Sequence, residues 1–366
     1  MAETDDPLLN ALRDPAGTLD LDAGAWDGLL RRARGHFLLA RLGYQLDDNG
    51  LLGRIPDAAR GQIQDAQARA DFNQHLIRVE LRSVGRVLEG LGVPLILLKG
   101  GAYAAAGLPC ARGRPAADLD ILVPQDRLPA VEQALTAHGW ESEITDSYDQ
   151  RFYRAWSHQI PPLRHKERRT ELDVHHTIAP PTSRAKADAG ALLADTRLLG
   201  DSQARVLAPA DMVLHAAVHL FNEEFLPTAL RNLLDLHDLL GHFGADEGFW
   251  AQLSERARRH GLERPLYYGL RYCERLFDTP IPAHAKAQVD AFGPNPMVRA
   301  IMDILVPPAI LPQDPERAGR GAGSARWLLF VRSHWLRMPP PLLARHLLVK
   351  TLRRATRSST VAAATR

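Results

Sequence analysis

The sequence predicts an α+β protein, in which a region of short strands lies between two helical regions. Apolar residues recur at helical spacing over residues 20–93 and again beyond residue 209. Between them, residues 94–178 contain short apolar or alternating runs bounded by glycine and proline, which is typical of strands. These changes of period indicate the order helices, mixed α and β, helices.

Length and composition agree with a globular protein of more than one domain. The chain has 366 residues, of which 45% are apolar, enough for about two or three domains with real cores. The expected parts are a helical N-terminal region (1–93), a core (94–205), a helical C-terminal domain (206–355) and a disordered tail (356–366).

Composition also excludes several classes of protein. Gly and Pro are near their average usage, charged residues make up 24%, and no long stretch is poor in apolar residues, which excludes a collagen-like or disordered chain. Cys110 and Cys273 are too few for a disulfide scaffold, and we expect free thiols. No apolar run approaches the ~20 residues that span a bilayer, and Asp5 and Asp6 stand where a signal peptide needs positive charge. We therefore expect a cytoplasmic protein without integral membrane association.

In the N-terminal region, Trp26, Leu29 and Leu30 mark one helix, and residues 57–91 form a long amphipathic pattern that stops at a Gly-Leu-Gly-Val-Pro sequence. Asp20-Leu-Asp22 precedes the first of these helices, where acidic residues are ordinary N-caps. We assign this Asp-x-Asp to structure.

In the central region, the run Pro94–Leu98 predicts a buried strand, followed by the turn Lys99-Gly100-Gly101 and a small-residue helix over 102–106. The alternating segment 118–123 predicts a second strand that turns Asp118 and Asp120 to the same face. A helix over 125–138 and a strand over 171–175 follow. Beyond residue 209, we expect helices over 210–221, 228–243, 247–260 and 263–277.

The two aspartates and the glycine turn have a chemistry in common. Asp118 and Asp120 are roughly 7 Å apart along the strand, so both carboxylates can reach one or two divalent ions. At Gly100-Gly101, backbone N–H groups at the start of a helix can approach phosphate oxygens. Each pattern alone is common in structural roles, but their order along the chain brings phosphate and metal together.

Taken in order, these residues resemble the uncharacterised nucleotidyltransferases of the DNA polymerase β-type superfamily. The resemblance covers about residues 75–282 and lies in Leu97-Leu98-Lys99-Gly100, Arg114, Asp118-Leu119-Asp120-Ile121-Leu122-Val123, Leu172-Asp173-Val174-His175, Pro209-Ala210-Asp211, His215 with His219, and Leu234-Asp235-Leu236. It implies a mixed-sheet core in which Asp118, Asp120 and Asp173 bind two Mg²⁺ or Mn²⁺ ions. The implied reaction moves a nucleoside monophosphate from an NTP to a hydroxyl-type acceptor and releases pyrophosphate.

The resemblance also suggests roles for individual residues. Asp173 would lie nearest the nucleophile, as a metal ligand or as a proton acceptor. Lys99 and Arg114 are candidates for phosphate contact, with an ion pair to a nearby carboxylate as the alternative for Arg114. His175 would orient Asp173 or contact the nucleotide, or would simply end its strand.

Two features depart from the usual pattern: the glycine turn lacks a serine, and the gap from Gly101 to Asp118 is longer than in the minimal pattern. Many superfamily members have Gly-Ser in the glycine turn, whereas this chain has Gly100-Gly101 followed by Ala102, which points to a Lys-Gly-Gly branch that includes toxin-type nucleotidyltransferases. His215 and His219 have a spacing that can bind zinc, but the glutamate and cysteine that usually accompany it are missing. Packing or a substrate-side role is favoured for these histidines.

The C-terminal segment has its own charge pattern. The net charge of the whole chain is only +2, which makes no general case for nucleic acid, but residues from Arg317 onward contain eleven Lys and Arg and no Asp or Glu. We expect an amphipathic helix here that packs its apolar residues on the helical domain and turns its basic side chains outward. These apolar residues are Trp327, Leu328, Phe330, Val331 and Trp335. Peripheral contact with an anionic membrane, RNA or a partner protein is the alternative.

Three functional hypotheses remain open from the sequence. The first is a nucleotidyltransferase whose acceptor is a small molecule, peptide, protein or RNA. The second is a catalytically silent nucleotide-binding protein, which the presence of all three candidate carboxylates disfavours. The third is a basic RNA- or membrane-associated adaptor, which the nearly balanced net charge disfavours as a sole role.

Overall fold

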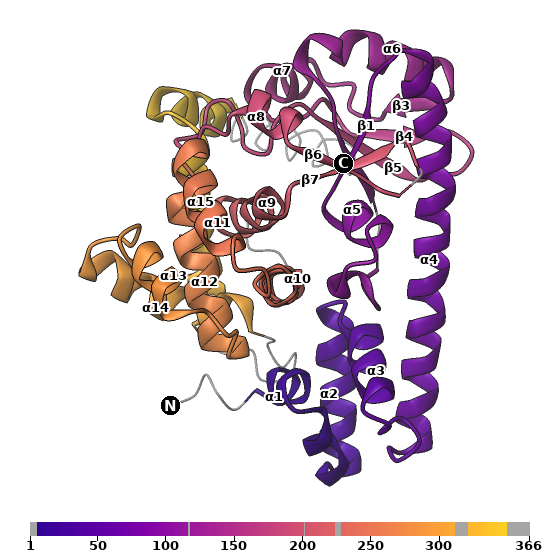
Figure 1. The fold of residues 1–366 in the computed structure, drawn as a ribbon, viewed down its shortest axis with the longest axis vertical. Coiled ribbons are helices and arrows are strands. Elements are labelled where there is room, and N and C mark those ends of the chain that lie inside the picture. Colours follow the sequence, from indigo (N-terminus) through magenta and orange to yellow (C-terminus); the bar gives the residue numbers. More distant parts are fainter. Residues whose placement is uncertain (1–5, 116–117, 201, 224–227, 312–320, 350–366) are drawn as a thin grey trace, which may run out of the picture.

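The computed structural model of the protein describes residues 6–115, 118–200, 202–223, 228–311 and 321–349, and it confirms the α+β fold. The described strands form one seven-stranded mixed sheet in the order β3-β4-β5-β2-β1-β7-β6. Figure 1 shows the sheet beside one end of the long helix α4, with the helices of the C-terminal half gathered on the other side of the molecule.

The elements follow the chain in three groups. The N-terminal group is α1 (Pro7–Arg13), η1 (Pro15–Asp20), α2 (Ala23–Gly35), α3 (Leu39–Asp48) and α4 (Asp57–Gly90). The central group is β1 (Leu95–Leu98), α5 (Lys99–Ala105), η2 (Pro109–Ala111), β2 (Asp118–Leu122), η3 (Gln125–Arg127), α6 (Leu128–Ala137), β3 (Trp140–Ser142), α7 (Ser147–Trp156), β4 (Leu163–His165), β5 (Glu171–His175), α8 (Ala189–Ala194), β6 (Thr196–Leu198) and β7 (Ala204–Leu207). The C-terminal group is α9 (Pro209–Asn222), α10 (Ala229–Phe243), α11 (Phe249–His260), α12 (Glu263–Phe277), α13 (Ala283–Asp290), α14 (Pro296–Ile310) and α15 (Ala322–Arg337).

The N-terminal helices form where the sequence predicts them. Asp22 caps α2 by accepting a hydrogen bond from the Ala25 N–H at 2.8 Å, so the first Asp-x-Asp is structural, as expected. Helix α4 runs from α3 at one end to the sheet at the other (Figure 1). Val84 packs in the core near the sheet, whereas Phe72, in the middle of the helix, is 61% exposed.

The register of the sheet sets the position of the functional residues. Strand β2 is antiparallel to β1 and parallel to β5, and Asp120 is the register partner of Leu98 on one side and of Asp173 on the other. The alternate residues Leu119 and Leu172 are fully buried. The aspartates therefore share the opposite face of two neighbouring strands.

The four helices that follow residue 209 confirm the expected pattern. Asp211, in the first turn of α9, is completely buried and accepts a hydrogen bond from Arg256 Nε of α11 at 2.9 Å. His260 Nε2 lies 3.3 Å from the same carboxylate. The Pro-Ala-Asp motif thus joins α9 to α11. Cys110 and Cys273 are free and buried, as expected.

The expectation for the C-terminal helix is wrong in two respects: most of its apolar residues are exposed, and its basic residues Arg326 and Arg332 donate hydrogen bonds into the fold. Helix α15 forms, but Trp327 is 62% exposed, and Leu328, Val331 and Trp335 are exposed as well. The helix instead packs through a narrow face of small and aliphatic residues, which are Ala322, Ala325, Leu329 and Ser333. Small side chains permit close approach to neighbouring helices, and this contact selects the face that turns inward.

None of the described helices is long and apolar enough to cross a membrane. The tail expected over residues 356–366 lies outside the described residues. The domain boundaries proposed from the sequence stay predictions.

Candidate functional site

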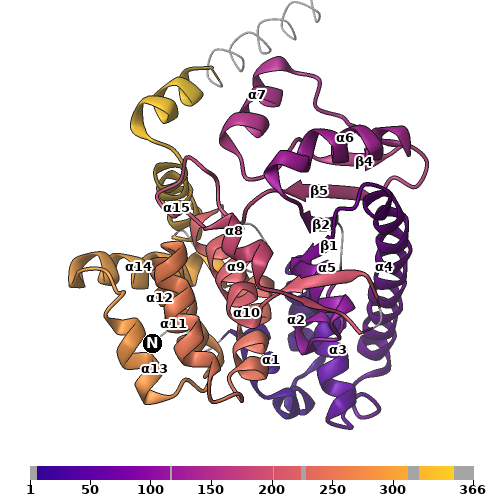
Figure 2. The ribbon, with the colours of Figure 1, turned by 45° about the horizontal axis from the view of Figure 1, so that its top comes forward.

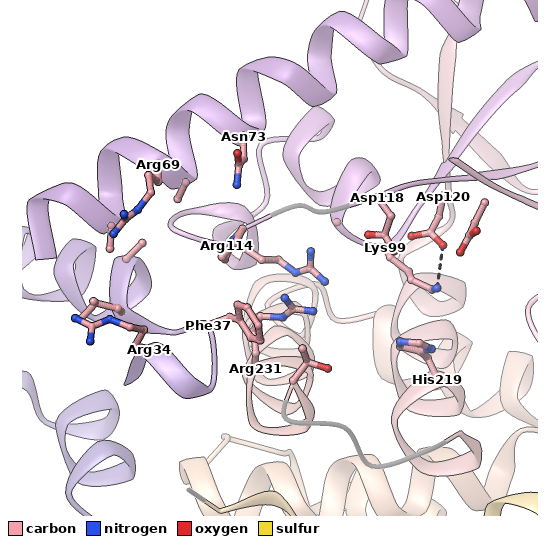
Figure 3. Close-up of a pocket in the computed structure, with 18 of the residues that line it drawn as sticks. Arg34, Phe37, Arg69, Asn73, Lys99, Arg114, Asp118, Asp120, His219 and Arg231 are labelled. Atoms are coloured by element: carbon pink, nitrogen blue, oxygen red, sulfur yellow. Dashed lines mark hydrogen bonds and ion pairs between the residues drawn. The ribbon is translucent and has the colours of Figure 1, made fainter. Parts of the chain in front are cut away.

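A cavity of about 1050 Å³ brings the predicted carboxylates together with residues from distant parts of the chain. Strands β2 and β5 and the start of α5 form one end of it, and helices α2, α3, α4, α9 and α10 contribute to the remainder. Figure 3 shows Asp118, Asp120 and Lys99 at one end of the cavity and Arg34 and Arg69 at the other.

The three aspartates line this cavity side by side. The register of β2 and β5 pairs Asp120 with Asp173, and Asp118 precedes Asp120 by two residues on the same face. Ligand atoms of Asp120, Asp173 and His175 all lie within 4.8 Å of one another, so this group can hold a metal ion. Asp118 is not a member of that group, and its role as a metal ligand stays a prediction.

Asp120 is buried and held in place by two hydrogen bonds. It is 2% exposed, and its Oδ1 accepts hydrogen bonds from Lys99 Nζ at 2.9 Å and from His175 Nε2 at 2.8 Å. Burial disfavours the charge, but Lys99 and His175 hold the pKa of Asp120 well below its usual range. Both contacts use Oδ1, which leaves Oδ2 for a ligand.

His175 has a different role from the one expected. Its side chain is completely buried and contacts Asp120 on the neighbouring strand, so it neither lines the cavity nor orients Asp173 by a hydrogen bond. The reason is geometric. In a parallel pair, the residue at the end of β5 reaches across to β2.

Asp118 and Asp173 have the opposite electrostatic character to Asp120. Burial and the negative charge of Asp120 raise the pKa of Asp173 to about 6, and the same two causes raise the pKa of Asp118. One carboxylate is therefore held ionised while its neighbours take up a proton more readily. Such a divergence among adjacent acids is typical of catalytic sites.

Lys99 joins β1 to α5 in a strained backbone conformation. Its φ is 44°, in the left-handed region that non-glycine residues rarely adopt. Burial opposes its charge, but Asp120 and then Glu223 raise the pKa of Lys99 above its ordinary value. Helix α5 begins at Lys99 itself, three residues earlier than expected, so both glycines lie in its first turn.

The two glycines face different neighbours. A Cβ atom at Gly100 would collide with the guanidinium of Arg114, whereas a Cβ atom at Gly101 would meet Leu119 Cδ1 at 3.0 Å. Gly100 lines the cavity, and Gly101 is buried against β2. A phosphate contact at Gly101 stays a prediction, and at position 100 the end of the Arg114 side chain would have to shift to make room for a Cβ atom.

Arg114 makes the ion pair that was its alternative assignment. Its Nε donates to Asp235 Oδ2 of α10 at 2.8 Å, and both side chains are largely buried. Arg114 nevertheless lines the cavity. Two motif residues separated by 121 positions thus meet in the wall of the site.

Arg231 is a site residue that sequence reasoning missed. It lies four residues before Asp235 on α10 and lines the cavity near Arg114 (Figure 3). Its Nε is buried without a hydrogen-bond partner among the described residues. Burial and the charge of Arg114 lower its pKa to about 10. Of the two guanidinium groups, only that of Arg114 contacts a carboxylate among the described residues, so the positive charge of Arg231 favours an anion here. The helical i, i+4 spacing from Asp235 was the available signal.

A second group that the sequence did not reveal surrounds Glu223. His219 Nδ1 lies 2.6 Å from Glu223 Oε2, and His158 Nε2 lies 3.8 Å from Glu223 Oε1. Burial opposes ionisation, but the histidines and Lys99 lower the pKa of Glu223. Burial and the nearby His175 lower the pKa of His158 to about 3, so this imidazole is neutral at neutral pH.

The helical histidine pair does not form a metal site. His215 is 3% exposed and packs near His175, with ring centroids 6.4 Å apart, whereas His219 faces the cavity (Figure 3). Within the part of the chain that the structure describes, neither belongs to a metal-ligating group. The expected packing role fits His215, and the substrate-side position fits His219.

Comparison with known proteins places this site in a family. The uncharacterised nucleotidyltransferase family matches residues 22–278, a span that includes the three aspartates, Lys99 and Arg231. No curated protein and no solved structure matches the chain. Because the match covers more than two thirds of the sequence, the chain belongs to the uncharacterised nucleotidyltransferase family.

Proposed function

We propose that the protein is a metal-dependent enzyme that transfers a nucleoside monophosphate from an NTP to a hydroxyl group of an acceptor. The observation that carries the proposal is the cavity itself. Asp120 and Asp173 form one end of it, and the two guanidinium groups of Arg114 and Arg231 lie in its wall. Oxygen ligands for a metal thus adjoin a wall suited to phosphate.

The donor set fits a hard divalent cation. Mg²⁺ and Mn²⁺ prefer carboxylate oxygens and retain positions for water and substrate phosphates. The free Oδ2 of Asp120 and the carboxylate of Asp173 would hold such an ion, and Asp118 would contribute to a second one. When bound, these ions polarise the α-phosphate and make the acceptor hydroxyl more acidic.

The basic residues supply the phosphate contacts. Arg114 is already oriented by Asp235, and Arg231 has no carboxylate partner among the described residues. Arg231 is therefore the side chain whose charge a triphosphate would best satisfy, through charge-assisted hydrogen bonds. Lys99, at the carboxylate end, would contact the phosphate nearest the metal.

The proposed reaction is an in-line substitution at the α-phosphorus. The acceptor oxygen forms a bond to the α-phosphorus, and the bond from that phosphorus to the oxygen bridging to the β-phosphate breaks. Pyrophosphate leaves with the bonding electron pair, and the hydroxyl proton passes to the Asp173 carboxylate. In the protein without metal, a pKa of about 6 leaves Asp173 ionised at neutral pH.

The part of the cavity away from the aspartates, which we call its other arm, offers a place for the nucleoside. Phe37 is 47% exposed and has a φ of 58°, so a strained backbone presents its ring to the cavity, between Arg34 and Arg231 in the view of Figure 3. An exposed aromatic ring is a stacking surface for a base. We assign the base to this arm and the acceptor to the side of Asp173.

The test is transfer of label from the α-phosphate. The protein is incubated with each α-labelled NTP, with Mg²⁺ or Mn²⁺, and with size-separated fractions of a cell extract. We expect label to appear on one fraction with the native protein and to be absent with Asp173→Asn. Asp22→Asn changes the structural Asp-x-Asp and retains a capping side chain, so it should keep full activity. A fully active Asp173→Asn variant would contradict the assignment.

A further inference from the structure

Helix α15 presents an apolar face to solvent. Trp327, Leu328, Val331 and Trp335 are 62%, 44%, 45% and 46% exposed. At ~100° per residue, these positions fall within about 100° of the helix circumference. They therefore form one continuous surface, which we call the α15 apolar face.

The interior contacts of α15 fix this orientation. On the packed side, Arg332 Nη1 donates to the Phe221 carbonyl at the end of α9 at 2.7 Å and lies over the Tyr268 ring. Arg326 Nε donates to the Ala309 carbonyl of α14 at 3.1 Å. Rotating the helix to bury its tryptophans would break these hydrogen bonds. The apolar face is thus outward because the arginines are used inside.

The segment that follows α15 also exposes apolar side chains. Residues 340–349 are helical, and Leu347 and Leu348 are 50% and 60% exposed. Figure 2 shows this yellow segment at the edge of the molecule, beyond α15. Further exposed apolar side chains thus follow α15 on the way to the C-terminus.

The charge around the apolar face is positive. The guanidinium of Arg184 lies 5.1 Å from the centre of the Trp335 ring, and Arg345, in the helical segment of Leu347 and Leu348, is exposed. Residues 321–349 carry four arginines and no acidic residue, and two of these arginines, Arg326 and Arg332, donate hydrogen bonds within the fold. A second copy of the chain docked through the same face would bring these like charges together, whereas an anionic surface complements them.

The composition of the face distinguishes a lipid surface from RNA. Phosphate binding to RNA needs outward arginine and lysine, but Arg326 and Arg332 of α15 are engaged within the fold. The outward residues are tryptophan, leucine and valine. Tryptophan and aliphatic residues on one face with basic residues around them are typical of helices that lie in the interface of an anionic bilayer.

We propose that the α15 apolar face, together with Leu347 and Leu348, is a peripheral binding surface for anionic membranes. Trp327 and Trp335 would lie at the boundary of headgroups and acyl chains, and the surrounding basic residues would contact lipid phosphates. This inference does not depend on the proposed nucleotidyl transfer.

The experiment is flotation of the full-length protein with phosphatidylglycerol–phosphatidylcholine vesicles and with pure phosphatidylcholine vesicles, at low and physiological salt. We expect binding to the anionic vesicles, a blue shift of tryptophan fluorescence, and weaker binding at higher salt. Trp327→Ser with Trp335→Ser should weaken binding at least tenfold without lowering the melting temperature, because both side chains are exposed. The matched control is Phe72→Ser, which removes an equally exposed ring from α4 and should bind normally.

Several results would overturn the proposal. These are failure of the native protein to bind anionic vesicles at low salt, or equal binding by the double tryptophan variant. Concentration-dependent dimerisation that the double variant abolishes, without vesicle binding, would identify a second copy as the occupant. Vesicle binding that appears only after removal of residues 350–366 would identify that segment as the cover of the face.

Discussion

Replacing Arg231 by methionine is expected to raise the stability of the free protein and to weaken its binding to nucleotides. Burial and the charge of Arg114 lower the pKa of Arg231 from its ordinary value to about 10. At about 1.4 kcal/mol per pH unit, the folded protein disfavours this charge by roughly 3 kcal/mol. Methionine keeps much of the apolar stem and removes the charge, so the free energy of unfolding should rise by about 1–3 kcal/mol.

Nucleotide binding should change in the opposite direction. A hydrogen bond to a charged group contributes about 1.5–3 kcal/mol, which corresponds to a roughly 10- to 100-fold increase in the Kd for an NTP. The assays are urea unfolding of the free protein and calorimetric titration with a non-hydrolysable NTP in the presence of Mg²⁺.

Arg256→Met is the matched control. Arg256 pairs with Asp211, which is completely buried and lies outside the cavity that holds the aspartates. Removing this arginine leaves a buried carboxylate without its partner and should destabilise the protein by about 3–5 kcal/mol, with nucleotide affinity unchanged. If Arg231→Met loses stability in the same way and binds nucleotide normally, Arg231 is a structural residue and the reasoning is refuted.

Three further outcomes are expected from the site. A proton competes with the metal for Asp173, whose pKa is about 6, so the affinity for Mn²⁺ should be constant above pH 6 and fall about tenfold per pH unit below it. Electron paramagnetic resonance measures this affinity, and an unchanged affinity down to pH 5 would argue against Asp173 as a ligand. Gly100→Ala should displace the Arg114 side chain, lower the free energy of unfolding in urea by about 1–3 kcal/mol and weaken NTP binding. An unchanged NTP affinity would show that binding does not need the close approach of Arg114 to Gly100. Phe37→Ala should raise the KM for NTP by about 5- to 100-fold while Phe37→Tyr retains it, and an unaffected KM would remove the base from this arm.

Local pattern predicted most of the elements that carry the site. Alternation placed Asp118 and Asp120 on one face of a strand, and the structure has that strand over Asp118–Leu122. Helical periodicity located α4 and α9 to α12 within a few residues. These predictions work because strand and helix periods depend on the burial of neighbouring side chains, which the sequence displays directly.

Contacts between distant segments were not predictable in the same way. The ion pair between Arg114 and Asp235 joins residues 121 positions apart, and no local pattern specifies it. His175 was expected beside Asp173, but its ring bonds to Asp120 because β5 lies parallel to β2 in this register. Strand register and helix docking determine such contacts, and both depend on the whole fold.

The orientation of α15 shows the same limit for a helix. Periodicity predicted an amphipathic helix, and its apolar side was expected to be the buried one. Two features of the fold turn the apolar side of the helix outward instead. The Phe221 carbonyl at the end of α9 accepts from Arg332, and small residues such as Ala325 allow close packing. Neither feature can be recognised from the helix sequence alone.

The central claim is that this cavity activates the α-phosphorus of an NTP, and the most direct test is the identity of the cleavage products. The protein is incubated with ATP, and then with each other NTP, in the presence of Mn²⁺ over long times, so that water replaces the acceptor. The account predicts equal amounts of nucleoside monophosphate and pyrophosphate, and neither product with Asp120→Asn. Formation of nucleoside diphosphate and inorganic phosphate, or unchanged turnover in Asp120→Asn, would contradict it.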